Sequence, residues 1–124
     1  MENQTENFNE DIMNDKDNEM YRILDIVVSC CATEIREGEF SISAEDVLGK
    51  SRDENVCMTR CILVNQLIWA GYTVSTISSL LGRTQHAIRH IKDMNTVFVK
   101  SSRAYRLALS EATLKCKNID PHGI

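Results

Sequence analysis

The sequence predicts an all-α protein, a bundle of five or six helices that contains a helix-turn-helix. In several segments apolar residues recur every three to four positions, which is the period of an amphipathic helix. The 124 residues include one proline and five glycines, too few for a loop-rich or all-β protein. Because no apolar run approaches 18 residues, we expect no membrane span, and we expect a single domain in the cytoplasm with reduced cysteines.

The N-terminal segment changes character near Asn18. Residues 1–18 are acidic and polar with few apolar anchors, so they are predicted to be an acidic disordered tail. A helix should begin near Asn18 and end at Gly38. Its apolar face is formed by Met20, Leu24, Val27, Cys31 and Ile35.

Two capping boxes follow, in which a serine and an acidic residue satisfy each other's backbone amides. Ser43-Ala-Glu-Asp46 should open a short helix through Leu48, and Ser51-Arg-Asp-Glu54 a longer one that ends near Ala70. The second half of the longer helix is apolar nearly all round, which predicts a central position with neighbours on several sides.

The next two helices are short and separated by glycine. Thr73 should cap a helix through Leu81, Gly82 should close it, and Arg83 or Thr84 should open the next. That helix is expected to be buried along Ile88, Ile91, Met94 and Phe98. A last helix should span roughly 102–117, so the domain covers 19–118 and is followed by a C-terminal tail, 119–124.

The stretch from Gly71 to Ile91 is the most informative for function. Two helices joined by a glycine turn, the second opening with polar side chains, are the layout of a helix-turn-helix. In that motif the second helix enters the DNA major groove by its N-terminal end.

The charge distribution agrees with a nucleic-acid partner. Residues 1–20 contain seven acidic residues and one lysine, whereas 50–106 contain nine basic residues and three acidic ones. Although the net charge of the chain is −4, residues 50–106 are basic, which favours phosphate binding by this part of the chain.

Other motifs point less clearly to chemistry. Residues 44–51 fit the loosest phosphate-loop pattern, but no β-run precedes them and Val47 and Leu48 look helical. Cys57 and Cys61 lie one helical turn apart without the second pair of ligands that a zinc site needs, and the same spacing of His86 and His90 lacks a third partner. We therefore predict no enzyme activity, no cofactor and no metal.

Residues 19 to about 100 resemble the C-terminal DNA-binding domain of the bacterial replication initiator DnaA. Ser43-Ala-Glu-Asp-Val-Leu-Gly-Lys-Ser-Arg52 is similar to the family segment I-x-V-x-D-L-L-x-K-x-R. Leu81-Gly-Arg-Thr-Gln-His-Ala-Ile88 aligns with the family signature G-G-R-D-H-[ST]-T-V. The resemblance implies a Trp-repressor/DnaA C-terminal-like helical fold and places Arg52 in the minor groove and Arg60 against the DNA backbone.

Within the signature, only Gly82, Arg83 and Ile88 are kept. Thr84 replaces an aspartate that accepts from cytosine, and Ala87 replaces a threonine that contacts a methyl group. Gln85 still suits adenine, and His86 suits guanine or phosphate. The resemblance thus implies DNA binding with a changed recognition sequence.

The predicted function is non-enzymatic binding of double-stranded DNA, as a regulator of transcription or replication in a bacterium, mobile element or phage. The alternative is a protein-interaction module that keeps the fold and binds a partner, for instance through the acidic tail. The tail is also expected to fold back over the basic surface. The predicted DNA-binding residues are Lys50, Arg52, Arg60, Arg83, Thr84, Gln85, His86, Arg89, Arg103 and Arg106.

Overall fold

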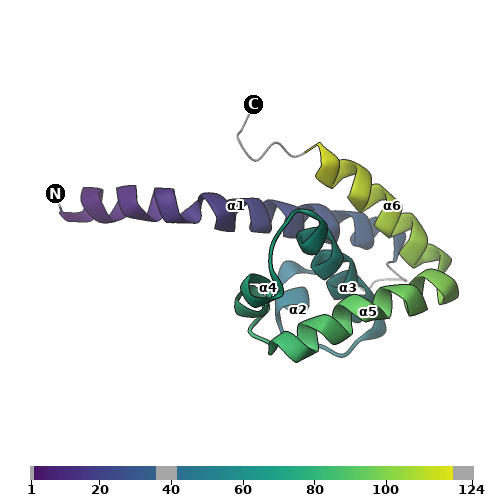
Figure 1. Ribbon diagram of the computed structural model, residues 1–124. Helices are drawn as coiled ribbons and strands as arrows, with labels where there is room; N and C mark the ends of the chain where they lie inside the picture. The colour runs from purple at the N-terminus through teal and green to yellow at the C-terminus, as the bar shows by residue number, and fades with distance from the viewer. Residues whose placement is uncertain (1, 36–41, 119–124) are drawn as a thin grey trace.

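The computed structural model describes the backbone of residues 2–35 and 42–118, and the side chains from Asn18 onward within these ranges. Its elements are α1 (Glu2–Glu34), α2 (Ala44–Leu48), α3 (Glu54–Trp69), α4 (Val74–Leu81), α5 (Gln85–Ser101) and α6 (Arg103–Lys117) (Figure 1). The predicted all-α class and the helix count are confirmed for the described residues. Residues 36–41, with the expected helix end at Gly38, and the tail 119–124 lie outside them.

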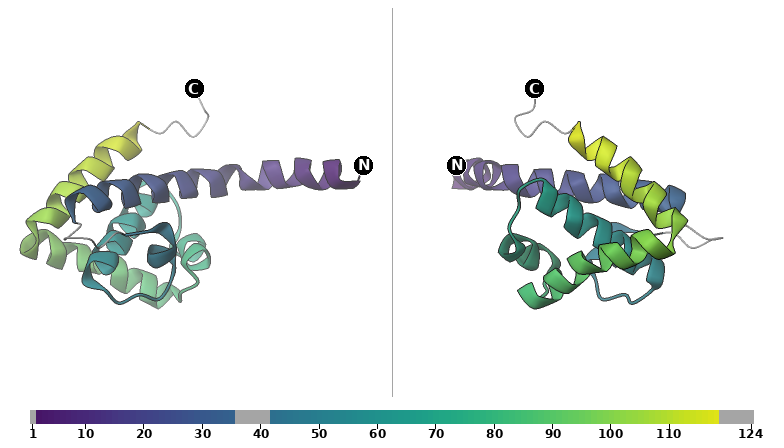
Figure 2. Two further views of the ribbon diagram at one scale, coloured as in Figure 1. Left: turned by 180° about the vertical axis from the view of Figure 1, so that it is seen from behind. Right: turned by 45° about the vertical axis from the view of Figure 1, so that its right-hand side comes forward.

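The N-terminal helix corrects the prediction of a disordered tail. α1 is continuous from Glu2, not from the neighbourhood of Asn18. Once residues 20–34 are held by packing, each further helical residue adds a hydrogen bond without a new nucleation cost, and acidic residues suit a helix N-terminus. Figures 1 and 2 show this acidic half extending beyond the other helices. A continuous helix with that course does not fold back over the basic residues.

α3 is the centre of the fold. It contacts each of the other five helices, and every residue from Met58 to Leu67 is buried. Against it pack the predicted apolar face of α1, Ile77 and Leu81 of α4, and Ile88 of α5, all at most 4% exposed. The apolar character of α3 on all sides therefore did predict its place. α6 covers the C-terminal half of α1, as both views in Figure 2 show.

The predicted helix caps are confirmed with one exception. Ser43 and Asp46 form the complete capping box of α2, and Thr73 caps α4. The cap of α6, for which no residue was predicted, is Ser102. Ser51 does not cap α3. Its hydroxyl accepts from the Asp53 amide at 3.3 Å, and Asp53 is the cap, since its carboxylate accepts from the amides at the start of α3. An ionised acceptor at a helix N-terminus is stronger than a hydroxyl.

The turn between α4 and α5 is closed by Gly82 in the left-handed conformation, with φ of 61°. The Arg83 amide donates to the Ser78 carbonyl at 3.1 Å, and the Ser78 hydroxyl donates to the Arg83 carbonyl. Thr84 then caps α5 through its hydroxyl, which accepts from the Ala87 amide at 3.1 Å. The turn is thus held by its own backbone and by two short side chains.

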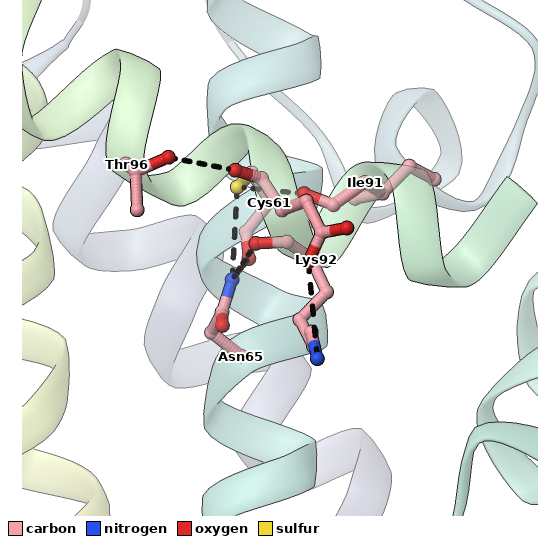
Figure 3. A network of polar contacts seen from close by, with 6 residues as sticks. Cys61, Asn65, Ile91, Lys92 and Thr96 are labelled. Carbon is pink, nitrogen blue, oxygen red and sulfur yellow. Dashed lines mark hydrogen bonds and ion pairs between the residues drawn. The ribbon is translucent and has the colours of Figure 1, made fainter.

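A buried polar network joins α5 to α3 (Figure 3). The Cys61 thiol donates to the Ile91 carbonyl at 3.1 Å, and the Asn65 amide donates to the Cys61 and Lys92 carbonyls. The Tyr105 hydroxyl of α6 lies 3.3 Å from Cys61 Sγ. These polar groups can be satisfied in few other arrangements, so they fix the rotation of α5 about its axis. Burial raises the pKa of Cys61 to about 11 and keeps it a neutral donor.

Within the described residues, no helix combines the length and the hydropathy that a membrane crossing requires.

The left-handed turn gives a first prediction. Gly82→Ala should lower the free energy of unfolding by about 1–2 kcal/mol, because a Cβ strains the left-handed backbone. Nothing lies within 4 Å of the position of that Cβ, so no steric clash adds to the cost. Gly82→Asn, a residue that tolerates this conformation, is the matched control and should lose less. Equal urea-denaturation curves for wild type and Gly82→Ala would contradict the assignment of the turn.

Candidate nucleic-acid interface

Arg60, predicted to contact the DNA backbone, is buried and only 4% exposed. Its Nε donates to the Val47 carbonyl at 2.9 Å, and its Nη2 lies 3.2 Å from the carbonyl oxygens of Asp46, Gly49 and Ser51. The side chain therefore binds the last carbonyls of α2 and the loop after it, where the helix dipole favours a cation. In this conformation the guanidinium is engaged by its own loop, and these contacts do not support the predicted contact with phosphate.

Arg83 is also engaged within the protein. Its Nη1 and Nη2 donate to the Gly49 carbonyl at 3.2 and 3.0 Å. The side chain is half-buried, so the arginine that was expected to lie among the base-reading residues joins the α4–α5 turn to the loop after α2. Burial lowers the pKa of Arg60, and the neighbouring charge of Arg83 lowers it further.

Gly49 is the residue on which the two arginines converge. Its carbonyl oxygen accepts from Arg60 and from both terminal nitrogens of Arg83. A Cβ at this position would lie 2.9 Å from the Glu45 carbonyl oxygen, so a larger residue requires the end of α2 to move. The signal for this role in the sequence is a glycine that follows a short predicted helix and precedes Lys50 and Arg52; no role was predicted for it.

The loop leaves two cations exposed. Lys50 and Arg52 are exposed on either side of the half-buried Ser51. An open hollow lies between this loop and the α4–α5 turn, and Lys50, Arg52, Leu81 and Gly82 contribute to its lining. Both cations therefore have the exposure that contact with DNA requires.

The N-terminal end of α5 is exposed as predicted. Gln85, His86 and Arg89 are exposed, and Arg89 Nη2 lies 3.5 Å from Gln85 Oε1 one turn away. The Thr84 hydroxyl oxygen accepts from the Ala87 amide in the cap of α5, which leaves its O–H available as a donor.

Arg103 and Arg106 lie at the other end of α5, where α6 begins. At 1.5 Å per residue, the 17 residues of α5 separate them from Gln85 by about 25 Å. Arg106 Nη1 also donates to the Val99 carbonyl at 2.7 Å. Both are exposed, but the fold does not bring them to Gln85 and His86, so they fall outside the cluster that the other residues form.

Carboxylates lie close in sequence to the exposed cations Lys50 and Arg52. Asp53 and Glu54 are exposed directly after Arg52, and Glu45 is exposed on α2. The Asp53 carboxylate accepts from the first amides of α3, so it is engaged by the start of that helix. The four arginines Arg52, Arg60, Arg83 and Arg89 therefore do not form one open basic face, because two of them bind the loop instead.

The motifs with competing chemical interpretations have structural roles. In the phosphate-loop match, 44–48 form a capped helix that ends at Gly49. Cys61 is buried in the α3–α5 network, and Cys57 Sγ accepts from Arg60 Nη1 at 3.8 Å. Within 18–35 and 42–118, no group of three His, Cys, Asp or Glu side chains is placed to hold a metal.

No protein-family model, curated protein or solved structure matches the chain. The resemblance to the DnaA C-terminal domain therefore stays a prediction from the sequence motifs.

The position of Arg60 generates a second prediction. Arg60→Ala should lower the free energy of unfolding by about 2–4 kcal/mol, because several carbonyls lose a charged donor at once. Arg52→Ala, an exposed arginine of the same loop, should change it by less than about 0.5 kcal/mol. Urea denaturation followed by circular dichroism measures both. Similar small losses for the two variants would mean that Arg60 is not the internal support described above.

Proposed function

We propose that the chain binds duplex DNA without catalysis, with α4 and α5 acting as a helix-turn-helix and the loop 49–53 as a second contact. The observation that carries the proposal is that the exposed start of α5 and the exposed cations of the loop are joined through Arg83 and the Gly49 carbonyl. Two contact elements held at a fixed separation suit a rigid, regular partner such as a duplex.

In this proposal α5 enters the major groove by its first turns. Gln85, His86 and Arg89 supply donors and acceptors for base edges. Arg89 can form a bidentate pair with guanine, and Gln85 can form one with adenine. Because their side chains lie within 3.5 Å of each other, the two residues are expected to read neighbouring bases.

Lys50 and Arg52 contact the flank of the site. Arg52 enters the minor groove, whose negative potential is strongest in A·T-rich sequence, and Lys50 binds phosphate. This assignment agrees with the place that the DnaA resemblance gives to Arg52. In this assignment Arg60 does not contact DNA, and Arg103 and Arg106 are not needed for DNA binding. The biological role that fits best is a regulator of transcription or replication.

A protein-interaction module is the second candidate. It is favoured by Trp69, which is 56% exposed beside a groove lined by α1, α3 and α6, and by the acidic half of α1 that extends from the body. In that case a partner captured by the protein would be released by substitutions at Trp69 and unaffected by substitutions at Arg52.

The third prediction concerns salt. Duplex affinity should fall linearly on a log–log plot of affinity against salt concentration, and Lys50→Ala or Arg52→Ala should each reduce the slope by about 1, since each removes one phosphate or groove cation. Arg103→Ala is the matched control and should leave the slope unchanged. Fluorescence anisotropy on a randomised duplex pool measures it. Absence of binding at low salt would refute the proposed function.

The fourth prediction concerns base reading. Gln85→Ala and Arg89→Ala should each relax selection at one or two base positions, with about 1–3 kcal/mol of discrimination lost per bidentate contact. His90→Ala, a substitution on the same helix but one turn beyond His86, should preserve the selected sequence. Sequencing of duplexes selected by each variant makes the comparison. Identical selected sequences for wild type and Arg89→Ala would exclude Arg89 from readout.

A further inference from the structure

The backbone of Arg83 is held in place by hydrogen bonds. Its backbone amide and carbonyl are both bonded to Ser78, and the preceding Gly82 is in the closed left-handed turn. Its two terminal nitrogens then lie 3.2 and 3.0 Å from a single oxygen, that of Gly49. The guanidinium therefore transmits the position of the α4–α5 turn to a loop 34 residues earlier in the chain.

The loop receives this contact at its first residue. Gly49 ends α2, and Arg60 binds the same carbonyl and the carbonyl of Ser51. The chain is thus held at Gly49 and Ser51, and Arg52 leaves from a defined point instead of from a flexible loop. Contact by a side chain that is already ordered costs less entropy than contact by one that must be ordered on binding.

From these contacts we infer that Arg83 is a positioning residue that acts through Gly49 to set Arg52 for the minor groove. This inference rests on the proposed function. It separates Arg83 from Gln85 and Arg89, which are expected to touch bases, although Arg83 comes just before them in the sequence. The consequence is that a substitution in the α4–α5 turn should alter selection at the flank that Arg52 contacts.

Arg83→Lys is the decisive variant. Lysine keeps the positive charge but has no planar fork, so it cannot place two donors on one carbonyl in the same way. If Arg83 acted as a cation on phosphate, lysine would largely restore function. If it acts through the paired bonds to Gly49, lysine should behave like alanine.

The first readout needs no DNA. Backbone ¹⁵N relaxation of the free protein should give order parameters of about 0.85 for Lys50 and Arg52 in the wild type, and lower values in both Arg83→Lys and Arg83→Ala. Arg52→Ala should leave them unchanged, and α3 amides should stay rigid in all variants, as a control for folding. Order parameters that stay at the wild-type value in Arg83→Lys and Arg83→Ala overturn the inference.

The second readout is flank selection. The ratio of affinities for A·T-flanked and G·C-flanked duplexes should fall in Arg83→Lys to the value of Arg52→Ala, and the double variant should fall no further. A wild-type ratio in Arg83→Lys overturns the inference while the proposed function stands. If the wild type binds no duplex, the proposed function fails, and the role of Arg83 in setting Arg52 for the groove fails with it.

Discussion

The burial of the Arg60 guanidinium among the carbonyls of 46–51 is the constraint on which the candidate interface depends. Removing a cation from water is costly, and the cost is offset only when its donors are satisfied. Here the partners are main-chain oxygens from the end of α2 and the loop after it. Arginine suits this task because one planar group can serve several oxygens and stays charged when buried.

The consequence is that α2, its loop and α3 behave as one unit. α3 also carries the network that fixes α5, since Cys61 and Asn65 lie one turn apart on the same face and both bond to α5 carbonyls. A single central helix thereby sets both the loop, through Arg60, and the start of α5, through its packing. Arg83 links the α4–α5 turn to the Gly49 carbonyl. The exposed loop and the exposed start of α5 are therefore held at a fixed separation.

Much of the fold was predictable from sequence because its signals are local. The 3–4 residue period identified the buried face of α1, and the caps Ser43 and Thr73 act on amides three residues away. The helical state of 2–17 was not predicted, because a polar composition indicates only that a segment lacks a packing face. It does not show that a helix can extend into that segment from packed residues that follow it. Ser51 was preferred over Asp53 as the cap of α3 because both fit the local pattern and only the path of the loop decides between them.

The site was less predictable, because sequence does not distinguish an arginine that faces solvent from one that faces a carbonyl. Arg60 and Arg83 were grouped with Arg52 and Arg89 on charge and on the DnaA resemblance. In the structure Arg60 and Arg83 bind main-chain carbonyls, whereas Arg52 and Arg89 are exposed. Likewise, Arg103 and Arg106 belong to the same basic segment, and only the length and direction of α5 show that they lie at its far end.

NMR titration of the ¹⁵N-labelled protein with a duplex pool, observing backbone amides and the Arg Nε–H signals together, tests most directly whether Arg60 supports the interface from inside. We expect the amides of Arg52, Gln85 and His86 to shift, while the Arg60 Nε–H signal is resolved in the free protein and does not move on saturation. A large shift of the Arg60 signal, or shifts confined to Trp69 or Arg103, would contradict the central claim that Arg60 organises the interface from inside.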